Sequence, residues 1–294
     1  MQGKIIKGIA GFYYIYAEDG FLYECKARGI LRQKKITPLV GDDVVISVVD
    51  ESEHTGNLDE IMPRRNSLIR PAVANVDQAL IVFAKNNPIP NMGLLDRLII
   101  TMENSGIKSI IAFNKSDLDE PLGIESEKEK EAFRNAGYTV LDICARTGEG
   151  LDNLKRLLKG KVTTLAGPSG VGKSSLINQI CPDANMETGA ISEKLNRGRH
   201  TTRHAQILVI DNESFVFDTP GFTSFELRDI QASDLASFYP EYEKYTAGCK
   251  FSMCSHTHEP DCAVMRAVLS NDISRLRYDR YVKLYEELKA IKKY

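Results

Sequence analysis

The stretch from Gly167 to Ser174 constrains the fold more than any other part of the chain. It reads Gly-Pro-Ser-Gly-Val-Gly-Lys-Ser and matches the phosphate-binding pattern G-x-x-x-x-G-K-[ST] at every fixed position. The apolar run 162–166 before it predicts a buried strand, and 175–180 after it predicts a helix, which is the context that the pattern requires. In such a P-loop, backbone N–H groups converge on phosphate oxygens at the start of the helix. The predicted phosphate-binding residues are Gly167, Pro168, Ser169, Gly170, Val171, Gly172, Lys173, Ser174 and Ser175.

Two side chains of this loop are predicted to bind the phosphates and the magnesium ion. Lys173 supplies a cation to the outer phosphates, and the hydroxyl of Ser174 can ligate magnesium. The sequence therefore predicts a site for a nucleoside triphosphate with Mg²⁺.

Strands and helices alternate through the middle of the chain. Apolar runs predict buried strands, and amphipathic segments between them predict helices, which favours a parallel α/β sheet covered on both faces. Ligands of such sheets bind at the carboxyl ends of the strands. The predicted strands are 76–84, 108–113, 139–143, 162–166, 205–210 and 215–218, and the predicted helices are 94–103, 125–135, 151–158 and 175–180.

Two loops that follow predicted strands indicate a guanine base. Asn114-Lys115-Ser116-Asp117 is the N-K-x-D element of guanine-nucleotide proteins, in which the carboxylate of Asp117 accepts from the guanine N1–H and exocyclic amine, a pattern that adenine lacks. Cys144-Ala145-Arg146-Thr147-Gly148 resembles the S-A-K-x-G loop beside the base, with Cys144 and Arg146 in place of the usual Ser and Lys. The backbone N–H of Ala145 is the predicted contact to the base there.

Two further segments predict the elements that sense the γ-phosphate. In the loop 197–203, Thr202 is the preferred magnesium ligand and Thr201 is the alternative. In Asp218-Thr219-Pro220-Gly221, the D-x-x-G element, Asp218 is predicted to hold magnesium through water, and the Gly221 N–H to contact the γ-phosphate.

The residue after the D-x-x-G glycine is Phe222, which cannot orient a water molecule as glutamine does in signalling GTPases. His200 is therefore the candidate that positions or deprotonates the attacking water, although it could instead pack in its loop or contact RNA. The predicted catalytic residues are His200, Lys173 and Thr202.

The order of these motifs is unusual, because the guanine-reading loops precede the P-loop instead of following it. The sequence therefore predicts a circularly permuted GTPase domain, an arrangement that a fold tolerates when the original chain ends lie close together.

The first part of the chain predicts a small β-barrel. Short β-prone runs at 4–10, 12–16, 21–27, 43–49 and 58–62 are separated by turn residues, and five strands in about 65 residues suit an OB-fold. A basic segment in it suggests RNA contact, with a solvated basic loop as an equally weighted alternative. The candidate RNA-binding residues are Lys26, Arg28, Arg32, Lys34 and Lys35.

The tail predicts a structural zinc site of the Cys₃His type. Cys249, Cys254 and Cys262 provide three thiolates, and His256 or His258 can supply the fourth ligand. An amphipathic terminal helix follows, with Leu276, Tyr281, Leu284, Leu288 and Ile291 on its predicted buried side and Arg275, Arg277, Arg280, Lys283, Lys289, Lys292 and Lys293 on its predicted solvent side.

Composition limits the remaining choices. The 294 residues carry 38 Lys and Arg against 40 Asp and Glu, so nucleic-acid contact must come from local patches. The absence of an apolar leader and of an 18-residue apolar run predicts a cytoplasmic protein without membrane contact. Length and motifs predict three domains, at 1–68 (OB-fold), 69–225 (permuted GTPase) and 226–294 (helical zinc-binding).

Barrel, permuted motif order, the Gly167–Ser174 loop and the Cys-x₄-Cys-x-His-x₅-Cys spacing together resemble the ribosome small subunit-dependent GTPase A (RsgA) family of bacteria. The resemblance implies a late assembly factor that binds the small (30S) ribosomal subunit and 16S rRNA and hydrolyses GTP to GDP and phosphate, slowly alone and faster with the subunit. It favours His256 over His258, and it implies one structural Zn²⁺, Mg²⁺ with GTP, and a monomer. A metabolic P-loop kinase and a zinc-containing RNA-binding protein with a weakly hydrolytic site are the alternatives.

Overall fold

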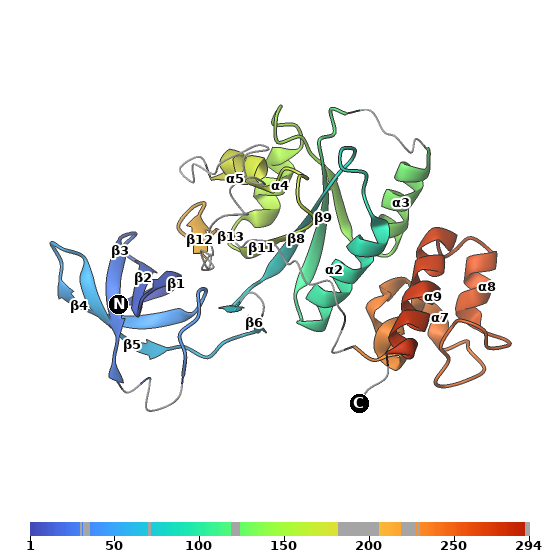
Figure 1. Ribbon diagram of the computed structural model, residues 1–294, viewed down its shortest axis with the longest axis horizontal. Coiled ribbons are helices and arrows are strands. Elements are labelled where there is room, and N and C mark those ends of the chain that lie inside the picture. The colour runs from blue at the N-terminus through green and yellow to red at the C-terminus, as the bar shows by residue number, and fades with distance from the viewer. Residues whose placement is uncertain are drawn as a thin grey trace.

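One hydrogen-bonded sheet runs through most of the molecule, in the order β10-β9-β8-β11-β13-β12-β1-β2-β3-β5-β4. The structure is a computed structural model, and it describes residues 1–29, 31, 36–69, 72–118, 124–181, 206–218, 227 and 230–291. Figure 1 shows the strands of the N-terminal barrel on one side, the central α/β layers in the middle and the C-terminal helices on the other side. The three-part architecture predicted from the sequence is confirmed.

The barrel is built from β1 (Gln2–Ile9), β2 (Phe12–Ala17), β3 (Leu22–Ala27), β4 (Asp43–Asp50) and β5 (Thr55–Ile61). It closes because β1 pairs with β4 as well as with β2, so the five strands form a ring. Alternate residues of these strands point inward, including Ile5, Ile15, Val44, Ile46 and Leu58, each at most 2% exposed. A short hairpin of β6 (Ser67–Ile69) and β7 (Ala72–Ala74), which the sequence did not predict, follows the barrel.

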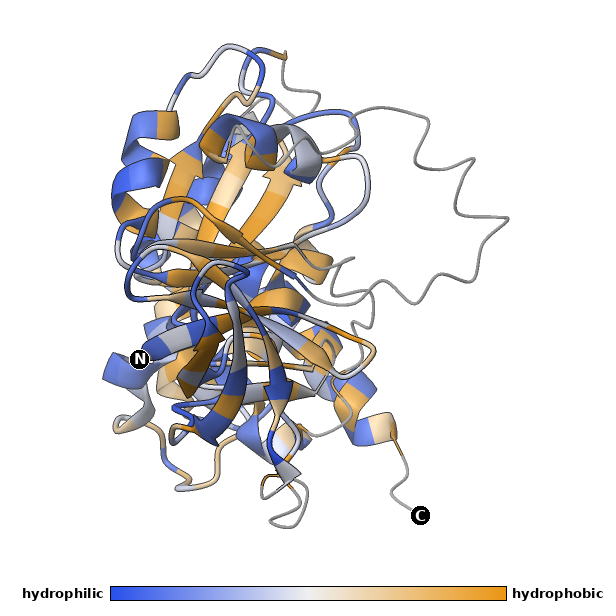
Figure 2. Cartoon of the chain, turned by 90° about the vertical axis from the view of Figure 1, so that its left-hand side faces the viewer, coloured by the Kyte–Doolittle hydropathy of each residue, from blue (hydrophilic) through white to orange (hydrophobic). Residues whose placement is uncertain are grey.

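The central sheet consists of β8 (Gln78–Ala84), β9 (Lys108–Asn114), β10 (Thr139–Asp142), β11 (Val162–Ala166), β12 (Gln206–Val209) and β13 (Phe215–Asp218). All of its pairings are parallel except that between β12 and β13. All seven residues of β8 are buried, which explains its unbroken apolar run. In Figure 2 these strands carry the colour of hydrophobic residues, with hydrophilic residues on the helices beside them.

Helices cover both faces of this sheet. Side chains of α2 (Met92–Asn104) and α3 (Ile124–Asn135) share a core with Ile81 and Phe83 of β8, whereas α4 (Leu151–Leu158) and α5 (Lys173–Ile180) share a core with Leu80 and Val82. Successive residues of one strand therefore face opposite helix pairs, as the period of two requires.

Barrel and central sheet are joined edge to edge. β1 pairs with β12 through Lys7 and Gln206, so the two parts share one sheet. Tyr16 packs edge-on against Phe215 at 6.1 Å, and its hydroxyl donates to the Asn212 side chain at 2.8 Å. The barrel consequently has a fixed attachment at the edge strand of the α/β layers.

The C-terminal lobe contains η2 (Ala232–Phe238), η3 (Pro240–Tyr242), α7 (Glu243–Thr246), α8 (Ala263–Leu269) and α9 (Arg275–Ala290). Tyr281, Leu284 and Leu288 of α9 are buried, as the sequence predicted. Leu276 and Ile291, also predicted to be buried, are 38% and 54% exposed. Within the described residues, no helix is long and apolar enough to cross a membrane.

Two arginines of α9 correct the sequence prediction. Arg277 and Arg280 were assigned to the solvent side of the helix, but their side chains are 2% and 15% exposed and contact the central domain. Arg277 donates to the Asp96 carboxylate of α2 at 2.7 Å and to Glu241, while Arg280 donates to Asp96 and, at 2.6 Å, to Glu129 of α3. Burial alone would lower the pKa of Arg277, but Asp96 and Glu241 raise it above its ordinary value, so the guanidinium stays charged.

This buried network generates a stability prediction. Asp96→Ala removes a carboxylate that is 2% exposed and shared by two arginines, and breaking a buried pair on one side costs about 3 kcal/mol of the free energy of unfolding. Glu287→Ala is the matched control, because Glu287 pairs with Arg97 across the same α2 and α9 helices but is 52% exposed, and such pairs contribute at most about 1 kcal/mol. Urea denaturation of both variants measures the difference, and equal losses would contradict a special role for the buried network.

Candidate functional site

The P-loop lies between the buried strand β11 and helix α5, as predicted. Two of its glycines leave no room for a side chain. A Cβ at Gly167 would lie 2.1 Å from the Val82 carbonyl oxygen, and one at Gly172 would lie 2.4 Å from Nδ2 of Asn114. Both residues have positive φ, 132° and 94°, a region that favours glycine. The loop is therefore held tightly against β8 and against the guanine-loop residue Asn114.

Lys173 is the first residue of α5, and its side chain folds back over the loop. Its Nζ donates to the carbonyl oxygens of Gly167 at 2.8 Å and Pro168 at 2.6 Å. Burial lowers the pKa of this ammonium group to about 8. A phosphate beside it would favour the charged form, which suits a group that binds the outer phosphates of a nucleotide.

Asn114 connects the P-loop to both predicted guanine loops. Its side chain is 2% exposed, its Nδ2 donates to the Val171 carbonyl at 2.9 Å, and its Oδ1 accepts from the Ala145 N–H at 3.0 Å. Lys115 adds a second link, because its Nζ donates to the Gly170 carbonyl at 2.9 Å and to the Asn87 carbonyl. The Ala145 N–H, the predicted contact to the base, thus has a hydrogen-bond partner inside the protein.

Asp117 accepts hydrogen bonds from both residues that differ from the S-A-K-x-G pattern. The Cys144 thiol donates to its Oδ1 at 2.9 Å, and Arg146 Nη2 donates to its Oδ2 at 2.6 Å. Hydrogen bonds from the Cys144 thiol and from its own backbone N–H, together with the charge of Arg146, lower the pKa of Asp117, so the carboxylate is ionised at neutral pH. Sequence reasoning missed Glu149, which accepts from the Ser116 hydroxyl at 2.9 Å and braces the same loop.

A hollow of about 430 Å³ lies where these loops meet. Its lining joins the two predicted guanine loops to the start of α5, which places the hollow next to the P-loop. The volume falls within the range of small-molecule sites, about 300–1,000 Å³. The lining residues are Asn114, Lys115, Asp117, Leu118, Cys144, Ala145, Arg146, Gly172 and Ser175.

Other predicted residues are placed in part or not at all. The backbone of Asp218 ends β13, one residue beyond the pair of Thr164 in β11 with Phe217, so it lies near the P-loop end of the sheet. In the barrel, Lys26 lies over the Phe12 ring at 4.9 Å, and Arg28 pairs with Asp59 at 2.7 Å. Outside the described residues lie His200, Thr201, Thr202, Gly221, Arg32, Lys34 and Lys35.

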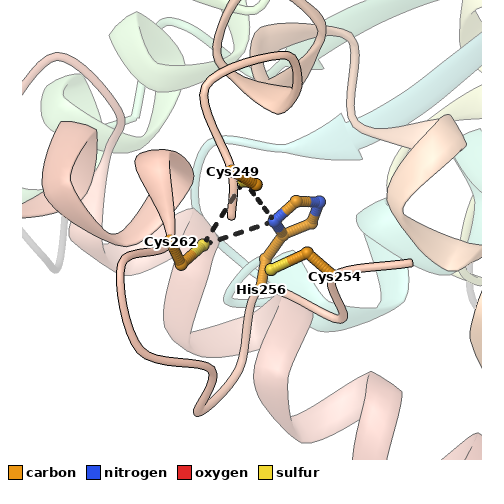
Figure 3. Close-up of side chains that lie close together, drawn as sticks. All are labelled: Cys249, Cys254, His256 and Cys262. Carbon is orange, nitrogen blue, oxygen red and sulfur yellow. Dashed lines mark hydrogen bonds between the residues drawn. The ribbon is translucent and has the colours of Figure 1, made fainter. Parts of the chain in front are cut away.

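The structure gathers Cys249, Cys254, His256 and Cys262 into one cluster, with ligand atoms within 4.8 Å of one another (Figure 3). The Cys249 and Cys262 sulfurs are 3.9 Å apart, and His256 Nδ1 lies 3.6 Å and 3.4 Å from them. Bond lengths of about 2.3 Å for Zn–S and 2.0 Å for Zn–N in a tetrahedron imply spacings of about 3.8 Å and 3.5 Å. The cluster therefore fits one zinc ion. His258 is exposed and contacts the Thr257 hydroxyl instead.

The ligand loop is supported by neighbouring groups. Tyr278 and Tyr281 of α9 donate to the carbonyl oxygens of His256 and Ser255 at 2.9 Å and 2.6 Å. The carboxylate of Glu259, a residue that sequence reasoning missed, accepts from the N–H groups of Ser255, Thr257 and His258. Desolvation opposes its ionisation, but hydrogen bonds from the Ser255 side chain and from the backbone N–H groups of Ser255, Glu259 itself and His258 prevail and lower its pKa to about 2.

Fold and site together define a P-loop GTPase of permuted motif order that also carries a closed Cys₃His metal cluster. A family model described as RsgA GTPase matches residues 61–228, and one described as RsgA N-terminal domain matches residues 2–55. A protein of Agathobacter rectalis named small ribosomal subunit biogenesis GTPase RsgA is 50% identical over 100% of both chains. One of the same name from Ruminiclostridium cellulolyticum is 46% identical and covers 99% of this chain and 95% of its own length.

Two solved structures are similar over nearly the whole chain. YjeQ from Thermotoga maritima is 33% identical with a TM-score of 0.85 and 99% of each chain covered. YloQ, described as a circularly permuted GTPase, is 38% identical with a TM-score of 0.83 over 100% of this chain and 96% of its own. The chain therefore belongs to the RsgA family of GTPases. P-loop GTPases use Mg²⁺ with GTP, as P-loop kinases use it with ATP, so it is the membership in a GTPase family that disfavours the kinase alternative.

The metal cluster generates a prediction about the tail. Cys254→Ala removes one of four ligands, so we expect the protein to hold much less than one zinc ion per chain and the ligand loop to lose its protection from proteolysis. His258→Ala is the matched control, because its ring lies outside the cluster, and zinc content should stay near one per chain. Metal analysis of protein purified without chelators measures both, and zinc loss in His258→Ala alone would reverse the ligand assignment.

Proposed function

We propose that this protein hydrolyses GTP to GDP and phosphate while bound to the small ribosomal subunit, as a factor in subunit biogenesis. One observation carries the proposal most directly: the hollow that Asp117 lines opens beside the P-loop, so a guanine base and its phosphates have adjoining sites. The relatives from Agathobacter rectalis and Ruminiclostridium cellulolyticum are named small ribosomal subunit biogenesis GTPases, which supports the ribosomal part of the proposal.

The proposed residue roles follow from this arrangement. The P-loop N–H groups and Lys173 bind the phosphates, and Ser174 and Thr202 would ligate magnesium, with Asp218 acting through water. The ion would neutralise charge on the β- and γ-phosphates. Asn114 and Lys115 hold the base loops together through the contacts described above, and Asp117 reads the base.

Contact with 16S rRNA is proposed for the barrel. Lys26 and Arg28 are exposed on it, and an ammonium group over an aromatic ring, as at Lys26 and Phe12, suits RNA backbone and bases. Arg28 already pairs with Asp59, so its share of such contact is smaller. Arg32, Lys34 and Lys35 extend the basic segment in the sequence.

We further propose that the protein is a monomer that acts in the cytoplasm.

Base recognition can be tested at Asp117. Asp117→Asn replaces an acceptor by a donor opposite the guanine amine, so GTP affinity should fall at least about tenfold while xanthosine triphosphate binding improves. Ser116→Ala is the control in the same loop, because that hydroxyl contacts Glu149 and not the hollow. Titration with both nucleotides measures the change, and GTP affinity within a few-fold of the parent in Asp117→Asn would refute the guanine site.

Turnover with purified small subunits tests the ribosomal proposal and the role of His200. We expect slow hydrolysis alone and faster hydrolysis with subunits, since the chain has Phe222 where signalling GTPases have a water-orienting glutamine.

His200→Ala should keep GTP and subunit binding but lose most of the stimulated rate, at least about tenfold. A near-parental stimulated rate would assign water positioning to a group of the ribosome, and no stimulation of the parent would refute the ribosomal role.

A further inference from the structure

Arg146 holds the carboxylate that is proposed to read the base. Its Nη2 donates to Asp117 Oδ2 at 2.6 Å, and both residues line the 430 Å³ hollow. A guanidinium group is planar and presents neighbouring N–H donors. The N1–H and exocyclic amine of guanine form a donor pair of the same kind, joined through one carbon atom. Arg146 therefore gives Oδ2 of Asp117 an N–H donor of the kind that guanine presents.

The two partners of Asp117 approach it from different sides. Cys144 is 1% exposed, so its thiol supports Oδ1 from within the protein. The Arg146 side chain is 78% exposed, whereas that of Asp117 is 18% exposed, so Arg146 covers the carboxylate from solvent. Solvent is also the side from which a nucleotide enters the hollow. Cys144 can stay in place when a base binds, but Arg146 occupies the approach.

We propose that Arg146 competes with the guanine base for Asp117 and must release the carboxylate when a guanine nucleotide binds. The proposal rests on the proposed function, because it requires Asp117 to read guanine. Under this proposal, Arg146 lowers the affinity of the site for the guanine base. Because GDP and GTP present the same base, Arg146 should weaken binding of both by the same factor.

The expected change in affinity follows from the exposure of the ion pair between Arg146 and Asp117 to solvent. An ion pair in contact with solvent shifts an equilibrium constant by up to about fivefold, and salt screens it. Removing Arg146 should therefore tighten GDP binding by about two- to fivefold at low salt, with a smaller gain at high salt. Inosine diphosphate lacks the exocyclic amine, so one carboxylate oxygen of Asp117 stays available to Arg146 when this nucleotide binds. Removing Arg146 should therefore increase the affinity for inosine diphosphate less than the affinity for GDP.

Titration of Arg146→Ala with GDP, a non-hydrolysable GTP analogue and inosine diphosphate tests the proposal. Arg156→Ala is the matched control: Arg156 is an exposed arginine of α4 that contacts Asn153, so its removal changes the net charge equally without touching Asp117. The competition is supported if Arg146→Ala binds GDP and the GTP analogue more tightly by the same factor and Arg156→Ala does not. Unchanged or weaker GDP binding overturns it, since Arg146 would then be neutral or would contact the bound base.

A second measurement separates this proposal from the guanine assignment. In an Asp117→Asn background with xanthosine diphosphate, the ion pair is already gone, so adding Arg146→Ala should bring no gain; a gain of the same size would show that Arg146 acts elsewhere. If the parent binds GDP no better than ADP, the guanine site itself fails. If it prefers GDP but Arg146→Ala does not tighten binding, only the competition fails.

Discussion

The amide side chain of Asn114 is the interaction on which the nucleotide site depends. It is buried between the P-loop and the second guanine loop, donating to Val171 and accepting from Ala145. A buried amide with both ends satisfied fixes the distance between the loops, since an unmade bond there would cost about 1–3 kcal/mol. Gly172 is part of the same constraint, because a Cβ would lie 2.4 Å from the Asn114 nitrogen. The P-loop and the two predicted guanine loops are therefore linked through one buried side chain.

The parallel sheet explains why the permuted chain order does no harm. β10, β9, β8 and β11 are parallel and adjacent in that order, so the loops at the carboxyl ends of β9, β10 and β11 lie at the same edge of the sheet regardless of which strand comes first in the sequence. The permutation changes which part of the chain follows β13. The chain leads from the Asp218 end of that strand to the C-terminal lobe, so the segment that the sequence predicts to sense the γ-phosphate precedes the metal-binding part along the chain.

Helix α9 connects that lobe to the central domain in two chemical ways. Its tyrosines Tyr278 and Tyr281 hold the carbonyl groups of the zinc loop, and its arginines Arg277 and Arg280 hold Asp96 and Glu129 of the central helices. The lobe is thus a fixed attachment, as the barrel is at the opposite edge through β1 and β12.

The sequence by itself determined the P-loop, the alternating strands and helices and the metal cluster, because each consists of residues close together along the chain. It also determined the permuted order, because that order is the order in which the local motifs occur. Tertiary structure decided the rest. Arg277 has its partner Asp96 at a separation of 181 residues, so the helix period alone assigned it to solvent, whereas two carboxylates on other elements made its burial favourable. The pairing of Arg146 with Asp117 and the joining of β1 to β12 likewise depend on loops and edges that meet only after folding. Periodicity reports which side of an element is apolar, but a charged side chain is buried or exposed according to the charges that distant segments bring to it.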